Sequence, residues 1–226
     1  EAVPFPYGEF RQTLLTSLAG GEGPDLARLD IIWSPEFAKL GVLAALDEVM
    51  PDFQEYADRV FPGPLATNAY DGHYWGLPLD TNTRVLLYNT RLYEAAGIQG
   101  PPQTIDDLAA QCEPIKALGE DKYVYSDGGT YGWAVLPWIW SFGGDITDPE
   151  ITKASGYLNG EKTVAAYQFL ADMVQSGCFS PSFLGGGLGT EGFFTDVFAN
   201  VLEGPWWYPM AAAQYPDFEI HATLMP

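Results

Sequence analysis

Short apolar runs alternate along this chain with helical stretches that end at glycine. Residues 84–88 read as a strand, and a helix that begins at Thr90 and closes at Gly97 follows directly. Later, residues 161–175 carry apolar side chains at helical spacing and are stopped by Gly177. Because strands that lead into helices are the repeating unit of α/β sheets, the pattern predicts an α/β fold.

The first eighty residues show the same rhythm in shorter pieces. Apolar side chains recur at helical spacing over residues 10–18, before a Gly-Gly stop. The second half of residues 24–33 is apolar and predicts a short buried strand. Ser34 is placed to cap a helix over residues 35–40, and residues 73–78 predict a further strand.

The remaining elements follow from local signals. Thr104 and Asp107 have the spacing of a capping box, and Pro114 should kink or split the helix that they start. Residues 131–142 are almost wholly apolar and aromatic, which predicts a buried helix too short to span a bilayer. Residues 198–202 predict a strand that leads into a turn.

The charge balance is strongly acidic, and it limits the partners. The chain of 226 residues has 30 acidic and 10 basic side chains, for a formal net charge of −20. With no basic stripe to neutralise phosphates, nucleic acid and anionic membrane surfaces are not expected partners. No run of about 18 apolar residues is present, so the sequence predicts no membrane span.

Residues that usually carry catalysis are sparse. There is no GxSxG motif, and the two histidines, His73 and His221, read as structural. The glycine tract at 185–189 lacks the ending of a phosphate-binding loop and predicts a flexible loop. Cys112 and Cys178 fit a disulfide and a pair of buried thiols equally well, and make a poor zinc set. No cofactor, metal site or catalytic residue is predicted.

Four acidic residues stand out because each has a tryptophan nearby in the sequence. A pyranose ring has apolar C–H faces, which an indole can cover, and a rim of hydroxyls, which can donate hydrogen bonds to a carboxylate. Neutral sugars also need no basic clamp. The acids with their neighbours are Asp30 with Trp33, Asp80 with Trp75, Asp145 with Trp138 and Trp140, and Glu203 with Trp206 and Trp207.

A glycoside hydrolase is the enzymatic alternative, with Asp80 or Glu203 in a catalytic carboxylate pair. Such a pair must lie roughly 5 to 9 Å apart around the sugar, a distance that no sequence contains. Taken singly, each acid reads equally well as a cap or turn residue. A binding site of aromatics and carboxylates needs no such spacing, and we favour it.

Five segments, in this order, resemble the extracellular sugar-binding proteins of bacterial ABC importers, the group with the maltodextrin- and trehalose/maltose-binding proteins. The set is specific for the family but says little about which sugar is bound. The segments are residues 23–30, 37–43, 74–78 with 87–89, 138–145 and 203–207.

The resemblance implies a two-lobed, periplasmic-binding-protein-like α/β fold of the class II type that closes on its ligand in a cleft. It places residues 1–82 in the first lobe, 83–220 in the second, and 221–226 at the start of a return crossing. Family members continue beyond both ends of this stretch, so the fold is expected to be incomplete at both ends.

Matching positions imply the ligand contacts. They would be Asp30 and Trp33 at the edge of the first lobe, Asp80 and Asn82 at the first crossing, Tyr131 and Trp133 in the second lobe, and Trp206 and Trp207 as a stacking platform. Glu203 is expected to be a turn residue.

The family resemblance also implies partners and location. The ligand would be a neutral mono- or oligosaccharide, passed unchanged to the membrane permease subunits of an ABC importer. The protein would be a monomer, extracellular or periplasmic, and lipid-anchored in the full-length precursor. A same-fold receptor for another solute, such as a polyamine, stays open, because carboxylates and aromatic boxes also suit cations.

Overall fold

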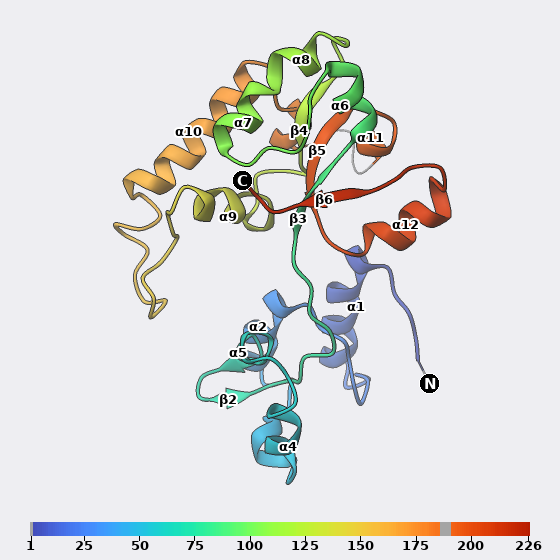
Figure 1. Cartoon of the computed structure of the whole chain (residues 1–226). Coiled ribbons are helices and arrows are strands. Elements are labelled where there is room, and N and C mark those ends of the chain that lie inside the picture. The colour runs from blue at the N-terminus through green and yellow to red at the C-terminus, as the bar shows by residue number, and fades with distance from the viewer. Residues whose placement is uncertain (1, 186–190) are drawn as a thin grey trace. The chain divides into compact units, whose positions relative to one another are not determined.

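The computed structural model describes residues 2–185 and 191–226 and divides into two compact units, Glu1–Thr81 and Asn82–Pro226 (Figure 1). Most of the glycine tract predicted as a loop lies outside the described residues. The lobe limits expected from the resemblance stay a prediction, so each unit is described by itself.

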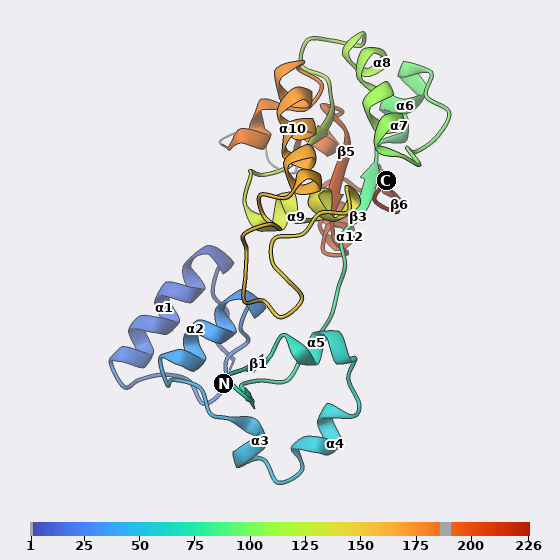
Figure 2. The ribbon, with the colours of Figure 1, turned by 90° about the vertical axis from the view of Figure 1, so that its left-hand side faces the viewer.

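The first unit is mainly helical. Its core joins α1 to α2, which lie side by side in Figure 2, through Leu14, Trp33 and Phe37. Its two short strands pair antiparallel. The elements are α1 (Tyr7–Ala19), the 3₁₀ turn η1 (Ile31–Trp33), α2 (Ser34–Lys39), α3 (Leu46–Val49), α4 (Phe53–Ala57), α5 (Pro62–Ala66), β1 (Ala69–Tyr70) and β2 (His73–Tyr74).

The buried strand predicted in the second half of residues 24–33 is wrong. The Asp30 carboxylate accepts a hydrogen bond from the Ile32 amide at 3.1 Å and starts the 3₁₀ turn η1 instead. Ile31 and Ile32 are exposed, so the apolar character of this segment did not correspond to burial in a strand. The next helix forms close to its predicted bounds, but Ser34 is its first residue, and Trp33 occupies the N-cap position without a side-chain capping hydrogen bond.

The second unit is built on a four-stranded mixed sheet with the order β4-β5-β3-β6 (Figure 1). β3 lies antiparallel between β5 and β6, and β4 runs parallel to β5. The strands are β3 (Val85–Tyr88), β4 (Tyr123–Ser126), β5 (Phe198–Glu203) and β6 (His221–Thr223). β6, in the segment expected to begin the return crossing, pairs with β3 here.

Both faces of this sheet are covered. Leu86 belongs to a core cluster with residues of α6, α7, α8, α9 and α10. Its neighbour Leu87 belongs to a second cluster with residues of α11 and α12, because successive side chains of a strand point to opposite faces. The helices are α6 (Thr90–Ala96), α7 (Ile105–Ala110), α8 (Cys112–Lys116), α9 (Gly132–Ser141), α10 (Glu161–Gln175), α11 (Glu191–Phe194) and α12 (Trp207–Gln214), with the 3₁₀ turn η2 (Pro181–Leu184).

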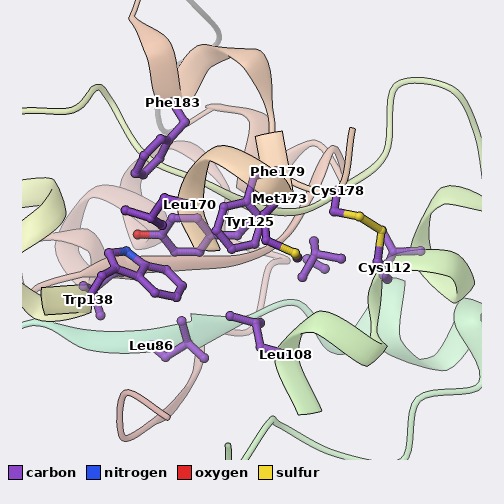
Figure 3. Packing of buried hydrophobic residues seen from close by; sticks show 14 of the residues in the cluster. Leu86, Leu108, Cys112, Tyr125, Trp138, Leu170, Met173, Cys178, Phe179 and Phe183 are labelled. Carbon is purple, nitrogen blue, oxygen red and sulfur yellow. A yellow bond between two sulfur atoms is a disulfide. The ribbon is translucent and has the colours of Figure 1, made fainter. Parts of the chain in front are cut away.

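The larger core cluster centres on Tyr125 and Trp138, which are both fully buried (Figure 3). Their rings meet edge to face with centroids 5.0 Å apart, and Phe179 packs against both. Within this cluster Cys112 and Cys178 form a disulfide, so the structure decides between the two alternatives that the sequence left open.

Several local signals of the second unit are confirmed. Thr104 and Asp107 form a capping box, and the helix predicted to kink or split at Pro114 is divided into α7 and α8. The proline ring would clash with the carbonyl four residues earlier, that of Ala110, which is the last residue of α7. In the first unit, by contrast, the strand predicted over residues 73–78 is shorter than expected, since only His73–Tyr74 pairs.

The helix predicted over residues 131–142 is present as α9, but it is not wholly buried. Ala134, Val135, Trp138 and Ile139 face the core. Trp133 and Trp140 lie on other faces of the helix and are 45% and 56% exposed. A helix that is almost wholly apolar therefore supplies both core and surface aromatics.

We expect removal of the disulfide to destabilise the second unit. The bridge joins residues 66 positions apart, and chain-entropy arguments assign a loop of that length about 4 kcal/mol. The variant Cys112→Ala/Cys178→Ala should lose an amount of this order in the free energy of unfolding, measured by urea denaturation. An unchanged midpoint would show that the bridge does not limit stability.

A charged cluster supports the small hairpin of the first unit. The Asp47 carboxylate accepts from the Tyr74 amide at 2.9 Å and lies 3.1 Å from Nδ1 of His73. This hydrogen bond raises the pKa of His73 above its ordinary 6.5, and the charges of Asp47, Glu48 and Asp71 raise it further. Burial opposes the shift.

The pKa of His73 gives a pH-dependent prediction. Because the folded pKa is raised, the interaction stabilises the first unit fully below pH 6.5 and is lost as the pH rises through the folded value. A ¹H NMR titration should give His73 a pKa above 6.5 that falls back in Asp47→Asn. His73→Gln assigns the signal. Equal pKa values in parent and variant would contradict the pairing.

Candidate functional site

Three exposed aromatic rings gather around one end of the sheet in the second unit. Tyr131 immediately precedes α9, Trp133 lies in its first turn, and Trp206 immediately precedes α12. They are 54%, 45% and 41% exposed, and the rings of Trp133 and Trp206 lie 6.1 Å apart at 35°. We call Tyr131, Trp133 and Trp206 the aromatic surface. Exposed rings of this kind are suited to stacking on a flat apolar ligand face.

A buried ion pair underlies this surface. Arg84, directly before β3, lies 2.8 Å from the Asp127 carboxylate, and the two side chains are only 6% and 4% exposed. The Arg84 Nε also donates to the Leu202 carbonyl at 3.0 Å, and its guanidinium carbon sits 5.1 Å from the centre of the Trp133 ring. The Tyr125 hydroxyl donates to Asp127 at 3.1 Å.

The half-buried Glu203 lies at the end of β5 beside the aromatic surface. Burial raises its pKa above the ordinary 4.5, and the charge of Asp127 adds to this, while Arg84 and hydrogen bonds from Gly204 and Trp206 oppose it. Burial also raises the pKa of Tyr131, with Asp127 and Glu203 contributing. Burial and the charge of Asp127 therefore disfavour ionisation of Glu203, whose carboxyl oxygens lie beside the aromatic surface as hydrogen-bond acceptors.

In the first unit, the predicted contact residues Asp30 and Asp80 are each bonded to another side chain of the same unit. Asp30 accepts from the Tyr7 hydroxyl at 2.7 Å, and the Tyr7 ring stacks on Trp33 with centroids 5.6 Å apart. Asp80 forms an exposed ion pair with Arg28 at 2.7 Å. Surface pairs of this kind contribute little to stability, so the Arg28–Asp80 pair leaves its groups available to solvent or ligand.

The eight predicted contacts therefore differ in accessibility. Trp207 is 3% exposed and packs among Phe193 and Phe194, and Trp33 is 9% exposed in the core of the first unit. Their rings are core side chains, and of the two tryptophans predicted as a stacking platform only Trp206 is exposed. The residues that solvent reaches are Asp30, Asp80, Asn82, Tyr131, Trp133 and Trp206.

Sequence reasoning missed Arg84 and Asp127. Arg84 is one of only 10 basic residues and precedes an apolar strand, where a charge is unexpected without a partner. Asp127 follows a strand and precedes Gly128-Gly129, and Trp133 lies six positions later, a spacing similar to those of Asp80 and Asp145 from their tryptophans. The isolated cation at a strand end was the usable signal.

Within residues 2–185 and 191–226, no cluster of three or more His, Cys, Asp or Glu side chains is arranged to hold a metal ion. Over the same residues, no helix is long and apolar enough to cross a membrane.

The sequence profile of the bacterial extracellular solute-binding protein family matches residues 1–217. The chain belongs to this family. The family is extracellular by its description and consists of binding proteins rather than enzymes, which agrees with the expectation of binding without catalysis.

Individual relatives agree with the family. A Brucella abortus (strain 2308) protein, named only as a binding protein, is 30% identical over 183 residues, which cover 78% of this chain and 42% of that protein. The arabinooligosaccharide-binding protein of Bacillus subtilis (strain 168) is 26% identical over 232 residues, covering 99% of this chain and 52% of that protein.

Among solved structures, the solute-binding protein of an ABC transporter from Thermotoga lettingae, bound with α-D-tagatose, superimposes with a TM-score of 0.85 at 27% identity. The superposition covers 100% of this chain and 60% of the Thermotoga chain. The α/β fold of the two-lobed solute-binding proteins is thereby confirmed. The chain spans between 42% and 60% of the length of these relatives.

We expect Gly204→Ala to displace Trp206. An added methyl at residue 204 would lie 2.2 Å from the Trp206 ring, and Gly204 is not among the positive-φ glycines, so the backbone accepts alanine. The ring must move away, which should raise acrylamide quenching of tryptophan fluorescence. Gly100→Ala, which meets no atom within 4 Å, is the matched control. A similar rise in quenching when Gly204→Ala is combined with Trp206→Phe would show that another tryptophan had moved.

Proposed function

We propose that this protein binds a neutral sugar or oligosaccharide through its aromatic surface and delivers it, chemically unchanged, to the permease of an ABC importer. The observation that carries the proposal is the group of exposed rings at Tyr131, Trp133 and Trp206 over a buried ion pair. The named ligands of two relatives, an arabinooligosaccharide and tagatose, support the sugar class.

The chemistry of the site favours a neutral ligand. Arg84 is already paired with Asp127 and carries no unmatched charge toward an anionic ligand. Glu203 beside the rings supplies carboxylate oxygens, which accept strongly from hydroxyls. A sugar that stacks on Trp206 would remove its apolar face from water and keep its hydroxyls on the carboxylate side.

The contacts of the first unit belong to the same proposal. Asp30 and Asp80 would accept hydrogen bonds from ligand hydroxyls, and the side-chain amide of Asn82, at the start of the second unit, can both accept and donate. An extracellular protein that is monomeric and lipid-anchored in its precursor is the form that we propose for delivery. Its partners would be the membrane subunits of the importer.

The test is a thermal-shift screen against maltose, trehalose, arabino-, xylo- and manno-oligosaccharides, with spermidine as the polyamine comparison. A sugar should raise the unfolding temperature, because a ligand that binds only the folded state stabilises it. Mass spectrometry of the sugar after incubation should then show an unchanged mass, whereas a hydrolase would cleave the sugar and produce new reducing ends. Stabilisation by spermidine alone would contradict the proposal.

Trp206→Ala should weaken binding of that sugar by about 1–3 kcal/mol, the scale of an aromatic face returned to water. Isothermal titration calorimetry measures the change. Trp140→Ala is the matched control, since Trp140 is 56% exposed on the same helix as Trp133 but is not part of the aromatic surface. Equal losses in the two variants would remove Trp206 from the site.

A further inference from the structure

We propose that Arg84 is a positioning residue that determines how Trp133 lies beside Trp206. The Arg84 side chain is 6% exposed, so it acts from beneath the aromatic surface rather than on the ligand. The consequence for sugar binding rests on the proposed function, whereas the effect on the two rings does not.

The first turn of α9 leaves a backbone group for Arg84 to satisfy. In an α-helix the carbonyl of Trp133 would accept from the amide of residue 137. Residue 137 is proline and has no N–H, so that carbonyl loses its intrahelical donor. The Nη1 of Arg84 donates to the Trp133 carbonyl in its place. The Trp133 carbonyl, which lacks an intrahelical donor because of Pro137, is thereby hydrogen-bonded to the residue directly before β3.

Arg84 also contacts the side chain of the same residue. Its guanidinium lies 5.1 Å from the Trp133 ring centre, within the range of a cation–π interaction. Trp133 is therefore held at its carbonyl and at its ring by one group. Because the Trp206 ring lies 6.1 Å away, the position of Trp133 sets one side of the space in which Trp206 can rest.

The guanidinium is itself fixed from the sheet. Arg84 bonds to Asp127 and to the carbonyl of Leu202 in β5. Asp127 is held in turn by the Tyr125 hydroxyl and by the Gly128 amide at 2.6 Å. The N–H groups of the Arg84 guanidinium thus donate hydrogen bonds to three separate chain segments, at Asp127, Trp133 and Leu202. A lysine ammonium keeps the charge but cannot reproduce that fork.

The test is Arg84→Lys in protein labelled with 5-fluorotryptophan, read by ¹⁹F NMR and assigned with single Trp→Phe variants. The resonances of Trp133 and Trp206 should shift and broaden. Those of Trp75 in the first unit and Trp138 in the core should not move. Arg91→Lys is the matched control, because Arg91 also combines a carboxylate, Asp196, with an aromatic ring, Phe218.

A rescue separates positioning from a general packing defect. Pro137→Ala restores an amide opposite the Trp133 carbonyl, so Arg84→Lys/Pro137→Ala should return the Trp133 resonance toward that of the parent. If Arg84→Lys does not fold, Arg84→Met/Asp127→Asn removes both buried charges together and is used instead. An unmoved Trp133 resonance in the folded variant overturns the proposal, as does a rescue that has no effect.

Binding of maltotriose and arabinotriose is then measured in the same variants. If Arg84 acts through the rings, Arg84→Lys should weaken whichever sugar binds by about tenfold, with recovery in the rescued variant. Parent protein that binds neither sugar counts against the proposed function, and the ¹⁹F result still decides the positioning role. If sugar binding weakens but the Trp133 and Trp206 resonances do not move, the positioning role of Arg84 is overturned and the proposed function is not.

Discussion

The buried pair of Arg84 and Asp127 is the interaction on which the aromatic surface depends. Taking both charges out of water costs several kcal/mol each, which their attraction offsets only when the remaining donors and acceptors are satisfied. Here they are matched by the Leu202 carbonyl, the Trp133 carbonyl and the Tyr125 hydroxyl. The pair therefore ties the start of β3 to β5, to the end of β4 and to the first turn of α9.

The sheet makes this arrangement possible because it is covered on both faces. Leu86 and Leu87 enter different cores, so β3 is buried on both sides and its start is held in place. The disulfide between Cys112 and Cys178 fastens α8 to the chain after α10 on one of those faces. A rigid sheet end is what allows loops to present side chains at fixed positions.

Local sequence signals predicted the elements that depend on neighbours in the chain. The capping box at Thr104, the split near Pro114 and the glycine stop at Gly97 need only a few adjacent residues. The predicted strand before Trp33 failed because its apolar residues face solvent and the Asp30 side chain captures the Ile32 amide. Apolar character does not reveal which side chains find a partner.

The sequence by itself determined the α/β class, the family and the presence of tryptophans next to acids. Only the tertiary structure decided which of those tryptophans reach solvent. Trp206 and Trp207 are adjacent in sequence, yet one is 41% exposed and the other 3%, because neighbouring side chains point in different directions from the chain. The partnership of Arg84 with Asp127 crosses 43 positions, and no local pattern encodes a contact of that range.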